Sequence, residues 1–394
     1  MNVLMISDVY FPRVNGVSTS IQTYRKDLAR RGCRSTLIAP QYDDEWQDDD
    51  QTRRVRARVV PFDPEDRLMK VGELRRTLDS LQHEFDLIHI QTPFIAHRVG
   101  VRLARRKRIP VVETYHTFFE EYLYNYIPFL PRELLRYLAR SFSRKQCNAV
   151  DAIVSPSSAM TEALLGYGVR RPIHTIPTGL SVECFERGDG DRFRRKHGIP
   201  AERPMVLHVG RVAIEKNIDF IFDVLPVVRA KIPDVLLVIA GEGPALIDLQ
   251  RRAVRDGIDD SVLFVGYLDR SDALVDCYKA ANVFAFASAT ETQGLVLLEA
   301  MASGLPVVST AEFGTRDILD HATGAIVAPK SVDAFGDSLL KVLNSPALRR
   351  ELSWEAKRHA ATWSSGAIVD RMVHLYQSLA NAAVEGTLAR SFEA

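Results

Sequence analysis

The stretch VFAFASATETQGLVLLEAMASGLPVVS, residues 283–309, has the pattern of one strand–helix–strand unit. The apolar run Val283–Ala287 has the length of a buried parallel strand, and a polar loop follows it up to Gly294. A helical pattern begins after this glycine, and Val307–Ser309 returns to strand character. We therefore predict a βαβ unit with its polar loop at the carboxyl end of a strand, where open α/β sheets bind their ligands.

The same alternation of short apolar runs and amphipathic segments extends over most of the chain. The predicted strands form two sets, first Val3–Ser7, Ser35–Ala39, Leu87–Ile90, Val111–Thr114 and Ala152–Ser155, and then Met205–Val209, Val235–Ala240, Val262–Val265, Val283–Ala287 and Val307–Ser309. The polar stretch Glu186–Arg203 separates the two sets, and we predict a linker at about 180–203.

These two sets predict an α/β protein with two doubly wound parallel-sheet domains, residues 1–180 and 181–369. The helical pattern at about 370–394 is predicted to pack back on the first domain. Because each sheet binds ligands at the carboxyl ends of its strands, we expect the domains to face each other across a deep cleft. Such a cleft suits a transfer between two substrates that must exclude water.

The composition of the 394 residues is that of an ordinary globular protein, with 46% hydrophobic and 26% charged residues. Lys and Arg number 51 and Asp and Glu 50, and the resulting net charge of +1 does not indicate a nucleic-acid partner. Four scattered cysteines form no disulfide framework and no zinc pattern, which favours a reducing compartment. Without a secretory signal or a membrane-spanning apolar run, we expect a cytoplasmic protein, or one bound peripherally to the inner face of the plasma membrane.

Charge is distributed unevenly along the chain. Residues 1–180 carry a net charge of +6, and the remaining residues carry −5. Arg105, Arg106 and Lys107 contribute to the basic excess. The sequence leaves two interpretations of this cluster open, a solvated helix end or a contact with an anionic membrane surface.

Gly16 and Val17 lie where the loop after the first predicted strand enters a helix, which Ser18 is predicted to cap. A glycine at such a place lets backbone N–H groups approach an anion. Taken alone, a single glycine more often marks a plain turn, so the sequence by itself favours that interpretation of Gly16.

Arg211 and Lys216 follow the predicted strand Met205–Val209. The planar fork of an arginine and the point charge of a lysine together suit a diphosphate. The alternative is a surface pair neutralised by Glu215. The position of both cations at the carboxyl end of a strand favours the diphosphate site.

The loop and helix after Val283–Ala287 carry the strongest functional pattern. Gly294 is predicted to free the backbone amides of Leu295 and Val296 to bind phosphate at the positive end of a helix. Glu291 lies on the loop and Glu299 eight residues later, inside the helix, and we expect one to face a sugar and the other a ribose. Apolar residues surround Glu299, so its charge should have a partner.

These motifs together resemble the retaining glycosyltransferases of the GT-B fold, group 1 or family 4. They are Gly-Arg-x4-Lys at 210–216, Gly-Glu-Gly-Pro at 241–244 and Glu-x7-Glu at 291–299. The resemblance covers nearly the whole chain, and it implies two Rossmann-like domains and a nucleotide-sugar donor that is a substrate rather than a cofactor.

The resemblance also implies roles for individual residues. Glu291 would hold the hydroxyls of the donor sugar, with Gln293 beside it, and Glu299 would bind the ribose. Arg211 and Lys216 would clamp the diphosphate and act in catalysis with Glu291 and His116. The remaining donor contacts would come from Gly16, Val17, Gly241, Glu242, Tyr267, Gly294, Leu295 and Val296. A single histidine is more often a buried core residue. His116, however, comes just after the strand Val111–Thr114, and this position favours a role near the sugar and the reacting centre.

Aromatic residues concentrate just after that strand. Phe118, Phe119, Tyr122 and Tyr126 are among them, and Arg132, Arg136 and Arg140 follow at a spacing of four. Aromatics beside a basic helical face suit an anionic membrane interface, whereas packing of the aromatics under a lid is the alternative. This element and Thr290–Gly294 resemble bacterial diacylglycerol glucosyltransferases in particular, which implies UDP-glucose as donor and a lipid hydroxyl as acceptor.

The chemistry that the resemblance implies needs no metal and no cofactor. Cations and the helix terminus would stabilise the leaving diphosphate, and the leaving phosphate oxygen would take the acceptor proton. The acidic run Asp48–Asp50 is predicted to be a solvated loop and not a metal site.

Other functions stay open. The acceptor could be a saccharide or a polyprenyl-linked glycan, or the donor GDP-mannose. More distant alternatives are a sugar-nucleotide epimerase, which the acceptor-side aromatics disfavour, and a non-catalytic binder, which the presence of the whole set of catalytic residues disfavours.

Overall fold

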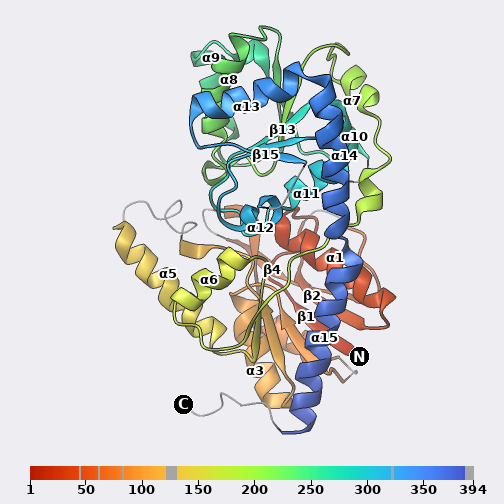
Figure 1. Ribbon diagram of the computed structural model, residues 1–394. Coiled ribbons are helices and arrows are strands. Elements are labelled where there is room, and N and C mark those ends of the chain that lie inside the picture. Colours follow the sequence, from red (N-terminus) through yellow and green to blue (C-terminus); the bar gives the residue numbers. More distant parts are fainter. Residues whose placement is uncertain are drawn as a thin grey trace. The chain divides into compact units, whose positions relative to one another are not determined.

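The computed structural model describes residues 1–43, 46–60, 63–81, 84–120, 131–270, 272–320 and 324–386. The chain forms two compact units, unit 1 with Met1–Gly179 and Ser365–Ala394, and unit 2 with Leu180–Ser364. The sequence had placed these boundaries at 180/181 and 369/370. In Figure 1, unit 1 holds the red to yellow part of the chain and also the dark blue C-terminal helix.

Unit 1 is built on a seven-stranded, wholly parallel sheet in the order β3-β2-β1-β6-β7-β8-β9. The strands are β1 (Asn2–Ile6), β2 (Arg34–Pro40), β3 (Thr52–Val55), β6 (Leu87–Ile90), β7 (Val111–Thr114), β8 (Ala152–Ser155) and β9 (Ile173–Thr175). A separate antiparallel hairpin joins β4 (Ala57–Val60) to β5 (Asp63–Met69). The five buried strands match the predicted ones, whereas the sequence missed the edge strands β3 and β9, which are short and less apolar.

The helices of unit 1 include the C-terminal one. They are α1 (Gly16–Arg30), α2 (Val71–Asp79), α3 (Ile95–Lys107), α5 (Arg132–Cys147), α6 (Ser158–Gly166) and α15 (Ser365–Val384). Helix α15 runs beside α1 (Figure 1) and reaches the sheet, where the Tyr376 hydroxyl lies 2.5 Å from His89 Nδ1. His89 Nε2 lies 2.7 Å from Thr114 Oγ1, and burial lowers the pKa of His89 to about 3. A neutral, buried histidine thus joins α15 to two central strands.

Unit 2 contains a six-stranded parallel sheet in the doubly wound order β12-β11-β10-β13-β14-β15. The strands are β10 (Met205–Val209), β11 (Leu236–Ala240), β12 (Val262–Gly266), β13 (Val283–Phe286), β14 (Val307–Ser309) and β15 (Ala325–Val327). The helices are α7 (Gly190–Lys196), α8 (Ile218–Arg229), α9 (Leu246–Arg255), α10 (Ala273–Ala280), α11 (Leu295–Ala302), α12 (Arg316–Leu319), α13 (Val332–Asn344) and α14 (Pro346–Thr362), with 3₁₀ turns η1 (Val182–Phe185), η2 (Ile214–Lys216), η3 (Asp259–Ser261) and η4 (Phe313–Thr315). Strand order reverses between β10 and β13, the point where such sheets bind ligands.

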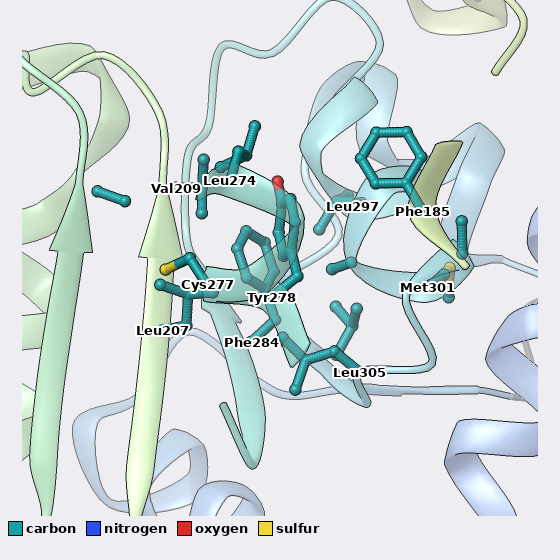
Figure 2. Close-up of a cluster of buried hydrophobic side chains, with 14 of the residues drawn as sticks. Phe185, Leu207, Val209, Leu274, Cys277, Tyr278, Phe284, Leu297, Met301 and Leu305 are labelled. Atoms are coloured by element: carbon teal, nitrogen blue, oxygen red, sulfur yellow. The ribbon is translucent and has the colours of Figure 1, made fainter. Parts of the chain in front are cut away.

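One face of the unit 2 sheet is covered by a core of large side chains. Figure 2 shows Tyr278 of α10 beside Phe284 of β13, with Leu207 of β10 and Leu297 of α11 around them. Tyr278 is fully buried. Its hydroxyl therefore needs a buried partner, and that partner belongs to the candidate site described below.

The stretch 180–203, predicted as a linker, is part of unit 2, so that prediction was wrong. It holds η1 and α7. Phe193 is buried, Asp189 caps α7, and the buried guanidinium of Arg194 donates to the Ala280 carbonyl at 2.7 and 3.0 Å. The sequence prediction was wrong because α7 is short and buries a single apolar side chain, so its composition is as polar as that of a linker.

Asp8 joins the loops after β1 and β6 to the start of α3. Its carboxylate accepts hydrogen bonds from Thr92 Oγ1 at 2.9 Å and from the backbone N–H of Ala96 at 3.1 Å. Burial raises the pKa of Asp8 to about 6, although these hydrogen bonds act in the opposite direction.

The stability of unit 1 should therefore depend on pH through Asp8. Because its pKa is raised in the folded state, its contribution is fully present below about pH 4 and is lost as the pH rises through about 6. We expect wild type to gain on the order of 1 kcal/mol relative to Asp8→Asn between pH 7 and pH 5, measured by urea unfolding. A difference between the two proteins that is equal at both pH values would contradict this assignment.

Candidate active site

The loops after β10 and β11 run side by side and extend the parallel ladder beyond the sheet. The backbone N–H of Val212 donates to the Glu242 carbonyl at 2.8 Å. A Cβ at Gly241 would overlap the carbonyl oxygen of Gly210, and a Cβ at Gly243 would overlap that of Val212. The two glycines of the Gly-Glu-Gly-Pro motif are thus required for the close approach of two backbones.

Lys216 and Glu291 form an ion pair at the carboxyl ends of β10 and β13. Lys216 Nζ donates to Glu291 Oε1, and less than a fifth of either side chain is exposed. Arg211 Nη1 lies 3.7 Å from Glu215 Oε1, and the Glu215 carbonyl accepts from Ser288 Oγ at 3.1 Å. The predicted clamp residues and Glu291 therefore lie together at the point where the strand order reverses.

Helix α11 begins directly after Gly294, whose φ of 94° lies in the left-handed region. Leu295 and Val296 open the helix, so their N–H groups are among those without an acceptor inside it. The N–H of Gly314 donates to the Glu291 carbonyl at 3.0 Å, and a Cβ at Gly314 would overlap the backbone of Thr292. Sequence reasoning missed Gly314, which holds the loop that carries Glu291.

Glu299 is 1% exposed and has two strong partners. Arg270 Nη2 donates to its Oε1, and the Tyr278 hydroxyl donates to its Oε2 at 3.0 Å. Burial lowers the pKa of Arg270, but the charge and the hydrogen bond of Glu299, together with the effects of Tyr278 and Tyr267, outweigh it, and the pKa is raised. The partners that we expected for this buried carboxylate are thus two side chains of the protein itself. The role of Glu299 toward a ribose stays a prediction.

His208 of β10 was also missed from the sequence, because a lone histidine in an apolar strand carries no pattern. It is fully buried, and its Nδ1 lies 3.1 Å from the Ala285 carbonyl. Burial lowers the pKa of His208 to about 4, and the Lys216 charge acts in the same direction. A neutral ring that donates from Nδ1 leaves Nε2 as an acceptor with no partner among the described residues.

The other predicted donor contacts of unit 2 lie around the same sheet end. The Tyr267 N–H is 3.4 Å from Glu242 Oε1, and the Tyr267 ring is half exposed. Gln293 is buried beside Gly294. Their part in holding a base or a sugar stays a prediction.

In unit 1, helix α1 begins at Gly16, which is exposed, and Val17 after it is half-buried. Its cap is Asn15, whose side chain accepts from the Ser18 N–H at 2.8 Å, whereas the Ser18 hydroxyl donates to the Arg13 carbonyl at 2.7 Å. The predicted Ser18 cap was therefore wrong. A Cβ at Gly16 would meet no atom within 4 Å, so the backbone at this helix start is accessible to a ligand.

His116 follows β7, as predicted, and its Nε2 lies 3.1 Å from Gln91 Oε1 at the end of β6. Nε2 therefore donates, and Nδ1 of the neutral ring is left as an acceptor. Burial lowers the pKa of His116 to about 4, so the ring is neutral near pH 7. This histidine suits hydrogen bonding to a substrate rather than delivering a proton from a charged ring.

The structure tests only part of the predicted aromatic acceptor surface. Phe119 is buried, and its ring lies 6.0 Å from those of Tyr115, Phe94 and Phe142, so direct membrane contact by Phe119 is contradicted. Phe118 is half-buried. Tyr122 and Tyr126 lie outside the described residues.

Two of the three spaced arginines on α5 bind a buried carboxylate. Arg140 donates two hydrogen bonds to Glu120 at 2.5 and 3.0 Å, and Arg136 Nε lies 3.5 Å from the same carboxylate. The Tyr167 hydroxyl also donates to Glu120, at 2.7 Å. Arg136 and Arg140 therefore anchor α5 to residue 120 instead of forming a free basic face.

The other charged clusters are surface features. Arg105, Arg106 and Lys107 form the last turn of α3, where cations complement the helix dipole, and Arg106 pairs with Asp79 at 2.7 Å. The run Asp48–Asp50 is more ordered than predicted, because Asp48 binds Arg54 through two hydrogen bonds of 2.7 Å. Within the described ranges, no three His, Cys, Asp or Glu side chains are grouped closely enough to hold a metal ion.

Comparisons with known proteins agree with this geometry. The family model for glycosyl transferases group 1 matches residues 189–359, and that for glycosyltransferase family 4 matches residues 14–184. An alpha-monoglucosyldiacylglycerol synthase of Streptococcus pneumoniae is 34% identical over 319 residues, 78% of this chain and 71% of the relative.

A GDP-mannose-dependent alpha-mannosyltransferase of Mycobacterium tuberculosis is 29% identical over 83% of this chain and 84% of its own length. Among solved structures, Anabaena HepE in complex with UDP superposes with a TM-score of 0.74 at 18% identity, covering 96% of this chain and 100% of that one. This structural likeness shows the fold.

Proposed function

We infer the function of this chain from its family, because it belongs to the group 1 and family 4 glycosyltransferases, which have the GT-B fold and transfer a sugar from a nucleotide sugar. We propose that it is a retaining, metal-independent glucosyltransferase. Its donor would be UDP-glucose, and its acceptor a lipid hydroxyl such as that of diacylglycerol. The observation that carries the proposal is the grouping of Arg211, Lys216 and Glu291 at the start of α11. The synthase relative supports the lipid acceptor, and the mannosyltransferase relative makes GDP-mannose the second donor to test.

The chemistry follows from the charges of this group. Cleavage of the sugar–phosphate bond leaves a diphosphate anion, which the two cations and the first N–H groups of α11 would stabilise. Glu291 is held by Lys216, which suits hydrogen bonding to sugar hydroxyls better than attack on the sugar. In the proposed retaining reaction, the leaving phosphate oxygen takes the proton of the attacking acceptor hydroxyl.

A second observation supports work at a membrane surface. Helix α5 exposes four large apolar side chains, Leu134, Tyr137, Leu138 and Phe142, and carries Arg144 and Lys145 in its last turn. An apolar helical face with cations at its end suits the interface of an anionic bilayer. None of the helices in the described ranges is both long and apolar enough to cross a bilayer.

The proposal is tested by measuring nucleotide release from UDP-glucose, UDP-galactose, UDP-GlcNAc and GDP-mannose, with and without diacylglycerol in anionic vesicles. We expect release of UDP from UDP-glucose that depends on diacylglycerol, persists in EDTA and gives an α-linked product by NMR. Turnover that is indifferent to lipid would reject the lipid acceptor, and inversion of the anomeric centre would reject retention.

The membrane face is tested by replacing Leu138 and Phe142 with glutamate. We expect binding to anionic vesicles to fall by about tenfold or more. Each change removes apolar area that would be buried in the bilayer, and it adds a negative charge that the anionic lipids repel. The matched control is Ile247→Glu/Val254→Glu, two exposed apolar residues of α9. Equal loss in both variants, or no loss in the first, would reject the α5 face. Charge reversal of Arg105, Arg106 and Lys107 tests the α3 cluster in the same assay.

A further inference from the structure

A cavity of about 520 Å³, widely open to solvent, lies in unit 2 at the end of the sheet opposite to the catalytic group. Asn282 and Pro306, the residues just before β13 and β14, line it from the sheet, and α14 lines it from the other side. Lys216 and Glu291 lie at the carboxyl ends of β10 and β13, whereas this cavity lies at the amino ends of β13 and β14, which are parallel to β10. It is therefore separate from the donor motifs.

The cavity is strongly cationic. Arg349, Arg350 and Lys357 line it, and none of the described residues that line it is acidic. Neither Arg350 nor Lys357 forms an ion pair within the part of the chain that the structure describes. These positive charges lie close together with no acidic side chain among the described residues that line the cavity, an arrangement that an anion would stabilise.

Two neighbouring groups respond to this concentration of charge. Burial and the charge of Arg350 lower the pKa of Arg349. Burial and the charge of Lys357 lower the pKa of Lys279, whose Nζ donates to the Ser303 carbonyl at 2.8 Å. The positive charge of Lys357 on α14 therefore acts on Lys279 of α10.

The cations are held in place by the fold. Arg349 Nη1 donates to the carbonyls of Val342 and Leu343 at 2.9 and 2.5 Å, which fixes it at the end of α13. Gly304 has a left-handed φ of 78°, and a Cβ there would lie 2.5 Å from Lys357 Cε. The glycine thus leaves the space through which the Lys357 chain passes.

One wall of the cavity offers an aromatic surface beside these cations. The Trp354 ring is 61% exposed, and the Arg358 guanidinium lies 4.5 Å from its centroid. A flat indole next to several cations suits a sugar ring that carries a phosphate, and the cavity is larger than a phosphate ion requires. We propose that this cavity binds a phosphorylated polyol, either a free sugar phosphate or the phosphoglycerol headgroup of a phospholipid, independently of the donor site.

Binding can be measured through Trp354 itself. The double substitution Trp46→Phe/Trp363→Phe leaves Trp354 as the only tryptophan of the chain. This protein, saturated with UDP so that the donor site is occupied, is titrated with inorganic phosphate, glucose, glucose 6-phosphate, and vesicles with or without phosphatidylglycerol. We expect a saturable fluorescence change with glucose 6-phosphate or with phosphatidylglycerol vesicles, and none with glucose. The first response identifies a free sugar phosphate, and the second a lipid headgroup.

The variant Arg350→Glu/Lys357→Glu should weaken that binding by about tenfold or more, because two charge-assisted contacts are reversed. The control Lys231→Glu/Lys341→Glu changes the net charge equally at two exposed lysines of unit 2 outside the cavity. No response to either phosphorylated probe, equal affinity for inorganic phosphate, or equal weakening in both variants would overturn the proposal. Because UDP is present throughout and no turnover is measured, these outcomes do not depend on the proposed transferase reaction.

Discussion

Replacing Lys216 by alanine should lower kcat/KM for the nucleotide sugar by about 10²–10³-fold, or roughly 3–4 kcal/mol of transition-state stabilisation. The lost ammonium pairs with Glu291 at the carboxyl ends of β10 and β13, where the negative charge of the leaving diphosphate would develop. Its removal also leaves the Glu291 carboxylate without its ion-pair partner. Nucleotide release at subsaturating donor measures the effect.

Two further proteins separate these causes. Lys231→Ala, an exposed lysine after α8, controls for the loss of one positive charge in unit 2 and should keep wild-type kcat/KM. Lys216→Ala/Glu291→Gln removes the unpaired carboxylate, so any activity that it regains over Lys216→Ala measures repulsion by Glu291. A Lys216→Ala enzyme as active as wild type would reject the clamp.

The second large effect is expected at Glu299. Glu299→Ala should destabilise unit 2 by about 3–5 kcal/mol, because it leaves the partly buried Arg270 guanidinium and the fully buried Tyr278 hydroxyl without their acceptor. Thermal or urea unfolding measures the loss, and Glu351→Ala, an exposed glutamate of α14, provides the control.

The double variant Arg270→Ala/Glu299→Ala should be more stable than the sum of the two single effects predicts, because it removes both charges of the pair. Additive effects would mean that the pair contributes no coupling energy. In Glu299→Gln, which keeps an acceptor oxygen, a raised KM for the donor with near wild-type stability would support the ribose role. An unchanged KM would remove that role.

The buried parallel strands could be predicted from the sequence because each is a continuous apolar run, and Leu87–Ile90, Val111–Thr114, Ala152–Ser155, Met205–Val209 and Val307–Ser309 agree to the residue. Thr52–Val55 could not, since an edge strand is half solvated and carries two arginines. The helix Gly190–Lys196 was hidden for a related reason, because one buried phenylalanine anchors an otherwise charged segment.

In the candidate site, local motifs located the residues but not their partners. The order of Arg211, Lys216 and Glu291 along the chain indicated a shared sheet end, and the structure pairs Lys216 with Glu291. Arg270 lies in a loop 29 residues from Glu299, and Gly314 lies in another loop, so no spacing links either to the site. The same limit explains why Arg140 was read as free surface, since its partner Glu120 is 20 residues away.

The return of α15 to unit 1 affects how this protein can be made and divided. During synthesis, residues 1–179 emerge from the ribosome before α15, whose Tyr376 contacts His89, so unit 1 stays incomplete until residues 365–384 have been translated. Unit 2 is in effect an insertion within unit 1, and residues 180–364 are a continuous segment that should be expressible alone. An expression fragment ending at residue 179 should instead aggregate, unless the α15 peptide is supplied in trans or fused by circular permutation.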